Sequence, residues 1–483
     1  MVPVMRPITN TEQTGGDSLS RDNAKPRESV PKTSKRRYWH HKRRDTVWYP
    51  FVPFGDLPQA ERVFVAELPT SSRLDSWCAG AAVETYLDGH YPTLRDTLPD
   101  GRRRTIMSAQ QWTGTDRIDS ALAARAWQWT EAAIRRAWRD PAVCLLSTPG
   151  TTGRDLWMRT PAAEACPLIG PAAGELIRRT ASQGRIETMP ARAELLPALH
   201  EYDMRLAYVA LLRGLPIGEP HHTTTATVTE VVEHRSRALI TFTVPADWRH
   251  VGLFAVKAGD AYTYPGVGYG GREFGPVWAD GCEVELAIRY GWRVHVHEAL
   301  VWGTTGEPLR TWAERLTGVI DRAGAELSTE GARAVRQLVR SILLHTVGAF
   351  HGGGHRVTVR AADLESAPIG AEMLRVHDDG SVSWREMRPA RWPEAIHPEW
   401  SAHIWARCRR RLLSTPGGGG ALTLDPATIV AIRTDAIYTT TPTGWEQWDD
   451  GKPGRWTLKR TVADPMPWPR SGTDVLAIRE GGR

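Results

Sequence analysis

The chain has 483 residues, 41% of them hydrophobic, and a formal net charge of +6. This length predicts two to four domains, because a domain usually has about 150 residues. The sequence contains no apolar run near the roughly 20 residues of a membrane span and no secretory h-region. Its five scattered cysteines form no CxxC pair. It therefore predicts a protein of the reducing cytoplasm without a disulfide framework or a zinc ribbon.

The N-terminal segment carries the whole net charge. Residues 1–45 hold 11 of the 61 Lys and Arg but only 5 of the 55 Asp and Glu, which leaves 50 of each for the rest of the chain. We predict a basic disordered tail over residues 1–46 that contacts DNA phosphates, with Tyr38 and Trp39 available for stacking. A leader that only adds solubility is the alternative. The candidate DNA-binding residues are Lys35, Arg36, Arg37, Lys42, Arg43 and Arg44.

The first folded segment shows strand patterns followed by one long helix. Residues 62–68 (RVFVAEL) predict a strand, and we expect its hairpin partner within residues 78–89. Over residues 117–138 the apolar positions recur with a helical period, which predicts an amphipathic helix. The stretch LLSTPGTTG at 145–153 is typical of a linker or loop.

The middle of the chain alternates short helices and strands. We expect a short helix ending before Gly184 and a strand over residues 196–206 that runs into another short helix. Strand patterns follow at 226–232 and 237–244. The glycine-rich stretch at 264–276 predicts a hairpin or surface turn, because no strand-to-helix transition surrounds its G-x-G. A helix, a glycine stop and a strand then extend over residues 284–302.

A helical pair is predicted from Thr311 to about Phe350. Thr311 and Glu314 form the pattern of a capping box at the start of the first helix. The second helix carries an apolar stripe over residues 331–350. On another face Arg333, Arg336 and Arg340 recur at helical spacing. Either they form a solvated face or they bind an external anion, since no acid lies four residues from Arg336 or Arg340.

Two aspartates flank this helical pair in the sequence. Asp203 lies at a predicted strand end, and Asp435 lies between two β-branched runs in VAIRTDAIYTT. Turn chemistry alone explains many such aspartates. However, two strand-borne carboxylates with a basic helix between them also suit nucleotidyl transfer, in which carboxylates hold two Mg²⁺ ions about 3.5–4 Å apart.

These segments resemble the motifs of family B DNA polymerases, and specifically the protein-primed polymerases of phages, linear plasmids and mobile elements. The stretch DMRLAYV keeps Asp203 and Tyr208 of the D-x-x-S-L-Y-P motif. RSILLHTVG keeps a cation in Arg340 and the glycine in Gly348, and RTDA keeps Asp435 of D-T-D-S. The segments GRIE at 184–187 and PGRWTLK at 453–459 are also similar to family segments. The resemblance covers roughly residues 145–460.

This sequence also departs from the family pattern. Arg340 replaces a lysine and is a poor proton donor, because its pKa lies above about 12. The primer-gripping K-x-Y segment is not evident after Trp456. In the proofreading motif D-x-E-T, which would fall at 67–70, Glu67 and Pro69 replace the acids. The resemblance thus implies an exonuclease-like domain without confident proofreading activity.

The implied fold class is α+β, a right-hand polymerase with a palm, helical fingers, a reduced thumb and a degenerate RNase-H-like N-terminal domain. The expected parts are a tail at 1–46, an exonuclease-like domain at 47–145, a connector and palm at 146–310, fingers at 311–356, palm at 357–450 and thumb at 451–483.

The implied function is template-directed DNA polymerisation for a phage, plasmid or mobile element, in the bacterial cytosol or nucleoid or in a phage-infected cell. Asp203 and Asp435 would hold two Mg²⁺ or Mn²⁺ ions. The implied partners are primer–template DNA, dNTPs and a terminal protein primer, and no membrane. The expected nucleotide-binding residues are Tyr208, Arg333, Arg336, Arg340 and Gly348.

Two other functions remain open on the sequence. The first is a catalytically degenerate polymerase-like protein that binds nucleic acid or serves a structural role, which the weakened motifs favour. The second is a nuclease, for which we identify no D-x-E or paired-carboxylate motif.

Overall fold

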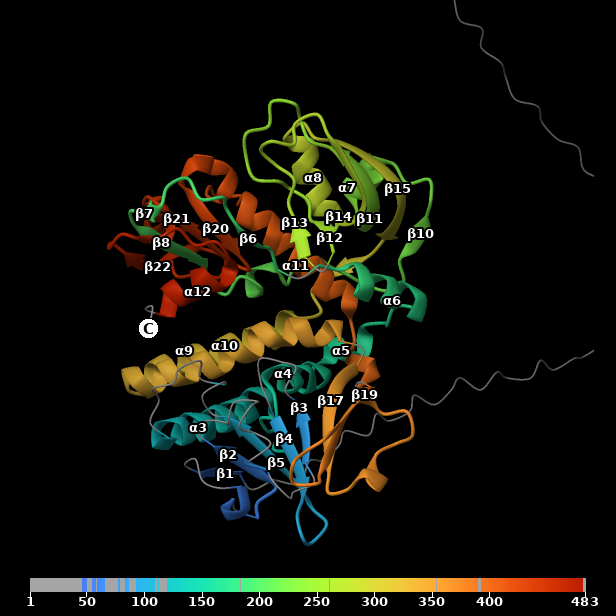
Figure 1. The fold of residues 1–483 in the computed structure, drawn as a ribbon, viewed down its shortest axis with the longest axis vertical. Helices are drawn as coiled ribbons and strands as arrows, with labels where there is room; N and C mark the ends of the chain where they lie inside the picture. The colour runs from blue at the N-terminus through green and yellow to red at the C-terminus, as the bar shows by residue number, and fades with distance from the viewer. Residues whose placement is uncertain are drawn as a thin grey trace, which may run out of the picture. The chain divides into compact units, whose positions relative to one another are not determined.

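The structure is a computed structural model that describes most of the chain beyond residue 45 (Figure 1). The described residues are 46–49, 54–57, 59–65, 77–78, 83–86, 93–108, 112, 120–182, 184–259, 261–352, 354–389 and 392–480. The basic tail with its six candidate DNA-binding residues, and the Glu67 segment, lie outside this set. Within it, no helix combines the length and apolar character needed to cross a membrane.

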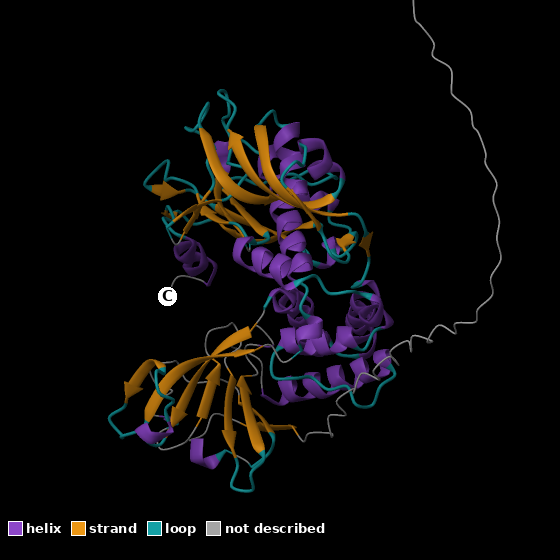
Figure 2. Cartoon of the chain, turned by 90° about the vertical axis from the view of Figure 1, so that its right-hand side faces the viewer, coloured by secondary structure: helices purple, strands orange, loops and turns teal. Residues whose placement is uncertain are grey.

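An eight-stranded sheet, at the bottom of Figure 2, combines strands from two distant parts of the chain, which are blue and orange in Figure 1. Strand β2 runs parallel to its neighbours β1 and β5, and the other neighbours are antiparallel. In sheet order the strands are β1 (Thr46–Tyr49), β2 (Arg62–Val65), β5 (Arg103–Ser108), β4 (Thr93–Thr97), β3 (Val83–Tyr86), β17 (Gly354–Ala361), β19 (Val382–Pro389) and β18 (Glu372–Val376). The predicted hairpin between residues 62–68 and 78–89 is therefore wrong, because β3 pairs with β4 and β17 instead of β2.

The later strands of this sheet come largely from a segment that the sequence assigns to the palm. The sequence places residues 357–450 in one palm segment, but strands β17 to β19 extend the eight-stranded sheet, with Thr358 opposite Thr85. Val357 and Val382 are buried there. Pairing with β17 also covers an edge of β3 that would otherwise expose unpaired backbone groups.

Helices pack together between the sheets. They are α3 (Ser120–Trp138), α4 (Pro149–Met158), α5 (Pro161–Ala165), α9 (Arg310–Glu326) and α10 (Thr329–His351). The predicted linker at 145–153 is wrong, because Thr148 caps α4 by accepting a hydrogen bond from the Thr151 amide at 3.1 Å. A Cβ on Gly150 would lie 2.9 Å from that of Ala349 in α10, so glycine permits this close approach.

The predicted helical pair is confirmed as α9 and α10, which lie side by side (Figure 1). The predicted capping box is wrong. Helix α9 begins at Arg310 after Leu309, so Thr311 is already inside the helix, and Glu314 pairs with Arg310 at 2.9 Å. The cap lies instead on the second helix, where the Ser328 hydroxyl accepts from the Gly331 amide at 3.3 Å.

A four-stranded sheet forms an insertion after the strand that carries Asp203. Its order is β10 (His221–Thr223), β15 (Arg293–Trp302), β11 (Arg235–Thr243) and β14 (Glu273–Asp280), and it is accompanied by α7 (Val228–Glu233), α8 (Gly281–Arg289), β12 (Val256–Ala258) and β13 (Ala261–Thr263). The strand predicted at 226–232 is wrong. This segment forms α7, because the Thr227 hydroxyl caps it by accepting from the Glu230 amide.

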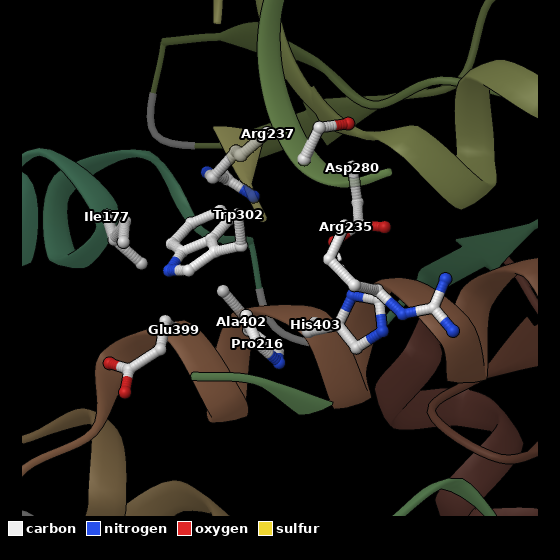
Figure 3. Close-up of a pocket in the computed structure, with 10 residues that line it drawn as sticks. Ile177, Pro216, Arg235, Arg237, Asp280, Trp302, Glu399, Ala402 and His403 are labelled. Atoms are coloured by element: carbon white, nitrogen blue, oxygen red, sulfur yellow. Dashed lines mark hydrogen bonds and ion pairs between the residues drawn. The ribbon is translucent and has the colours of Figure 1, made fainter. Parts of the chain in front are cut away.

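A buried polar cluster joins this insertion to α11 (Pro398–Leu413). Figure 3 shows His403 of α11 and Asp280 at the end of β14 beside a cavity of about 10 Å³, and their Nδ1 and Oδ2 atoms are 2.9 Å apart. The contact with His403 and the hydrogen bonds from Cys282 lower the pKa of Asp280 to about 2, although burial acts in the opposite direction. Arg409 of α11 adds two bonds to Glu283, at 2.8 and 3.0 Å. The cluster therefore fixes the insertion on α11.

A five-stranded antiparallel sheet carries both predicted catalytic aspartates. Its order is β22 (Trp456–Val462), β8 (Leu199–Met204), β21 (Ala436–Thr439), β20 (Ile429–Arg433) and β6 (Ile186–Thr188). Ile437 shares a core cluster with Cys408 and Leu412 of α11, whereas Tyr438 shares another with Trp468 and with Val475 of α12 (Gly472–Glu480). The alternation along β21 thus places α11 and α12 on opposite faces.

The remaining elements are short. They are α6 (Pro171–Thr180), the small pairs β7 (Leu195–Leu196) with β23 (Met466–Pro467) and β9 (Leu215–Pro216) with β16 (Thr305–Gly306), and the 3-10 turns η1 (Phe54–Asp56), η2 (Val209–Leu211), η3 (Leu364–Ser366), η4 (Pro393–Ala395), η5 (Ala421–Thr423), η6 (Pro426–Thr428) and η7 (Trp445–Trp448).

Candidate active site

Asp435 lies in a two-residue turn between β20 and β21. Arg433 pairs with Ala436, so only Thr434 and Asp435 form the loop. Thr434 has φ of +52°, which is unusual for a β-branched residue and normally requires glycine. Its amide donates to the Arg185 carbonyl at 2.7 Å, and its hydroxyl donates to Asp435 Oδ1 at 3.0 Å. The surrounding contacts therefore hold a strained turn that orients the Asp435 carboxylate.

The register of the sheet brings Asp203 beside this turn. Asp203 on β8 lies opposite Ala436 of β21, and the Met204 amide donates to the Asp435 carbonyl at 2.9 Å. Asp203 on β8 thus lies beside the β20–β21 turn that carries Asp435, one register position away. The structure brings together the two residues that the sequence pairs.

The Asp203 carboxylate is buried but only partly compensated. Its residue is 5% exposed, and one oxygen, Oδ2, forms an ion pair with the ammonium of Lys459. Among the described residues the other oxygen, Oδ1, is buried without a hydrogen-bond partner. A buried carboxylate oxygen without a donor is unfavourable, so this atom retains the capacity to bind a cation or a donor.

Tyr208 lies close to Asp435 after a sharp turn of the chain. Leu206 has φ of +43°, and Tyr208 then precedes the short 3-10 turn η2. Burial raises the pKa of the Tyr208 hydroxyl well above its ordinary value, and the Cys408 and Asp435 charges act in the same direction. Tyr208 therefore stays neutral at physiological pH, with its hydroxyl in the electrostatic field of the aspartate.

The predicted nucleotide-binding residues on α10 have no described hydrogen bond or ion pair with the two aspartates. Arg333 and Arg336 are exposed and Arg340 is half-buried, and no ion pair involves these three within the described part of the chain. Gly348 is also exposed, and a Cβ there would meet nothing within 4 Å. The arginines are therefore available to an external anion, but no described hydrogen bond or ion pair links them to the two aspartates.

Two polar residues near Asp203 were missed by the sequence reasoning. Glu201 lies two residues before Asp203 on β8, so both acids lie on one face of the strand, and the Tyr438 hydroxyl donates to Glu201 at 3.5 Å. The E-x-D spacing in LHEYDM is the sequence signal that points to Glu201. Lys459 had no such local signal, because only the pairing of β22 with β8 brings it to Asp203.

An open groove of about 740 Å³ begins next to the turn formed by Thr434 and Asp435. Its nearest wall is β6, where Ile186 pairs with Arg433. The opposite wall is the 250–274 segment, in which Tyr262 is 44% exposed and Tyr269 is 42% exposed. Arg192 and Arg470 also line the groove.

The lining of the groove has two arginines but one acid. Its lining acid, Glu187, is paired with Arg185, whose Nε lies 2.9 Å from the carboxylate and whose guanidinium lies 4.0 Å from the centre of the Tyr264 ring. The groove thus combines exposed tyrosines with arginines, a combination that suits stacked bases and phosphates.

The described residues contain no cluster of three or more His, Cys, Asp or Glu arranged to hold a metal ion. A cation bound at Asp203 and Asp435 would therefore take its other ligands from a substrate or from water, which is common for Mg²⁺.

The fold is that of a DNA polymerase. It is similar to Phi29 DNA polymerase in an orthorhombic crystal form, with a TM-score of 0.55 and 13% identity over 84% of this chain and 77% of that chain. The Phi29 DNA polymerase complex with single-stranded DNA gives a TM-score of 0.56 and 13% identity over 84% and 76% of the two chains. The ternary complex with primer-template DNA and incoming nucleotides gives 0.55 and 12% over 84% and 77%. No protein-family model and no curated protein matches the sequence.

The comparison supports the resemblance drawn from the sequence motifs at the level of the fold. A mixed helix-and-sheet architecture is shared with a DNA polymerase, and the α+β class is confirmed.

Proposed function

We propose that this chain is a template-directed DNA polymerase that adds dNTPs by metal-assisted nucleotidyl transfer at Asp203 and Asp435. The observation that supports this function best is the adjacency of the two aspartates on β8 and on the β20–β21 turn, in a chain with a DNA polymerase fold. The contacts of Thr434 hold its strained backbone and so orient the turn that carries Asp435.

The residues present fit a divalent cation. Carboxylate oxygens are preferred ligands of Mg²⁺ and Mn²⁺, and Asp203 Oδ1 is buried with no described partner. When bound, the metal would stabilise negative charge on the reacting phosphate and on the attacking and leaving oxygens. Asp203 and Asp435 would orient it, and the neutral Tyr208 would pack beside the bound nucleotide.

The incoming triphosphate would be held by cations of α10. Arg340 is half-buried and offers a planar fork to a phosphate, whereas Arg333 and Arg336 on the same helix are exposed. A ligand of this kind serves the ground state and the transition state alike. Replacing Arg340 should therefore raise KM for dNTP as well as lower kcat.

The tyrosine-lined groove would bind a single strand on its way to the catalytic turn. Ile186 of the groove wall follows Arg185, whose carbonyl accepts from the Thr434 amide. This position, the two exposed tyrosines and the two arginines support the assignment. The basic tail would add phosphate contacts, so its removal should flatten the salt dependence of binding.

One observation favours a second function, a degenerate polymerase-like protein that binds DNA without extending it. The Lys459 ammonium already contacts Asp203, so the carboxylate is partly neutralised by the protein itself. In this alternative the groove would still bind DNA, but the two aspartates would have no catalytic role.

A primer-extension assay with the full chain separates the two functions. A labelled primer–template with all four dNTPs is incubated with Mg²⁺ and separately with Mn²⁺, and DNA binding is measured on the same samples. Extension that depends on the metal supports the polymerase. DNA binding without extension in either metal would leave only the degenerate protein.

A further inference from the structure

Strand β22 contains an irregularity at Lys459. Leu458 pairs with Tyr202 and Arg460 pairs with Glu201, so the register with β8 shifts at Lys459, which forms a bulge. Bulges next to active sites redirect a side chain that regular pairing would place elsewhere. Here the redirected side chain forms the ion pair with Asp203.

The identity of this cation is unusual for the chain. Beyond residue 45 the sequence has only three lysines, Lys257, Lys452 and Lys459, and almost all other cations are arginines. Arginine also forms the buried pair of α11 with Glu283, in which Arg409 donates two hydrogen bonds. A lysine ammonium is a compact point charge, whereas a guanidinium is a planar fork that would occupy both carboxylate oxygens. Lysine therefore neutralises Asp203 while leaving Oδ1 available.

We propose that Lys459 is a resident cation of the active site and takes the position of one of the two metal ions. The site of the wild-type protein then binds a single divalent cation, at Asp435 and the open oxygen of Asp203. This inference rests on the proposed function for the role of the site, but its test measures metal binding and stability.

Burial gives the reason for such an arrangement. The Asp203 side chain is 6% exposed and that of Lys459 is 37% exposed, so the ammonium reaches solvent while its partner does not. Without the lysine, Asp203 would be a buried charge lacking compensation whenever no metal is bound. The lysine thus stabilises the metal-free protein, and its removal should open a second metal position.

The test counts Mn²⁺ ions bound to the full chain by electron paramagnetic resonance titration and follows the thermal unfolding midpoint in parallel. Wild type should bind one ion at the site, defined as the ion lost in Asp435→Asn. Lys459→Met should bind one additional ion and should unfold at a lower temperature without metal. Saturating Mn²⁺ should raise its midpoint more than that of wild type.

A matched control is Lys452→Met, since Lys452 is 74% exposed and pairs with Asp450 at 2.9 Å in the loop before the same strand. This variant should keep the wild-type count and midpoint. The double variant Asp203→Asn with Lys459→Met should regain metal-free stability, because it removes the uncompensated charge, and it should not bind the additional ion.

Two ions at the wild-type site, or none, would overturn the inference, and this comparison needs only wild type and Asp435→Asn. If Lys459→Met does not fold, Lys459→Gln serves in its place with the same expected count. An inactive chain with the expected change in ion count would contradict only the proposed function. An active polymerase with two ions in wild type would contradict only the role of Lys459.

Discussion

Two buried aspartates in different sheets are compensated in opposite ways. Asp96 of the eight-stranded sheet has a side chain 9% exposed, and Arg104 donates to both of its oxygens, at 3.0 and 2.5 Å. Asp203 of the five-stranded sheet is as buried, but it has a lysine on one oxygen and no described donor on the other. A fork-shaped pair uses the whole carboxylate for structure. The incomplete pair leaves an atom for a ligand, which is why we propose the five-stranded sheet as the reactive one.

The first prediction tests this contrast by activity. Asp203→Asn and Asp435→Asn should each lower nucleotide incorporation at least about a hundredfold, because each removes a negative ligand that acts mainly in the transition state. Single-turnover extension measures the rate, and primer–template binding should be unchanged. Asp96→Asn is the matched control and should keep its rate per folded molecule. Equal losses in all three variants would mean that the two aspartates do not differ in role.

The second prediction compares the stability of the Asp96 and Asp203 variants. Here the larger effect is expected for Asp96. Asp96→Asn should lower the free energy of unfolding by about 3–5 kcal/mol, because it breaks one partner of a buried pair with Arg104. Asp203→Asn should cost less than about 1 kcal/mol, since the released Lys459 ammonium reaches water. Urea unfolding of the two variants measures both free energies. A larger loss for Asp203→Asn would show that this acid is structural.

The third prediction concerns the groove beside the reactive sheet. Replacing Tyr262 and Tyr269 by alanine should weaken binding of a short oligo-dT at least about tenfold, because stacking on an aromatic ring contributes about 1–3 kcal/mol per base. Fluorescence anisotropy at fixed salt gives the Kd. The double phenylalanine variant keeps both rings and should bind like wild type. If alanine has no effect, the groove has another occupant, such as a protein segment.

The smallest effect on stability is expected in the β20–β21 turn, at Thr434. Thr434→Gly should raise the free energy of unfolding by about 1 kcal/mol, because glycine adopts the positive φ without strain. The same change should slow incorporation, since Asp435 loses the hydroxyl that donates to it. Thr434→Ser is the comparison, because it keeps the hydroxyl without β-branching. A stable, fully active glycine variant would show that the turn geometry does not matter.

Local sequence determined many of the elements. The strand pattern of residues 196–206, the apolar stripe of α10 and the two runs around Asp435 predicted β8, α10 and the β20–β21 hairpin. The motif order also paired Asp203 with Asp435. These signals succeed because strand and helix periods, and turn residues, act over a few neighbouring positions.

Some local signals were misread. Thr148 and Thr227 each cap a helix through a hydroxyl, and both were placed in a loop or a strand instead. The apparent capping box at Thr311 failed, because α9 starts at Arg310 and Glu314 pairs there. Short polar stretches of this kind fit a turn, a cap or a strand edge, and packing against α10 or β11 decides between them.

Tertiary structure alone decided three features of the reactive region. The pairing of β17 with β3, the contact of Lys459 with Asp203 and the joining of β6 with the 250–274 segment into one groove each connect residues far apart in the chain. Register determines which residues of two strands meet, and a shift of one position would turn Lys459 or Asp203 to the other face. The sequence by itself determined that one acid lies at a strand end and the other between two strand runs, and the register decided that Asp203 is already held by a lysine.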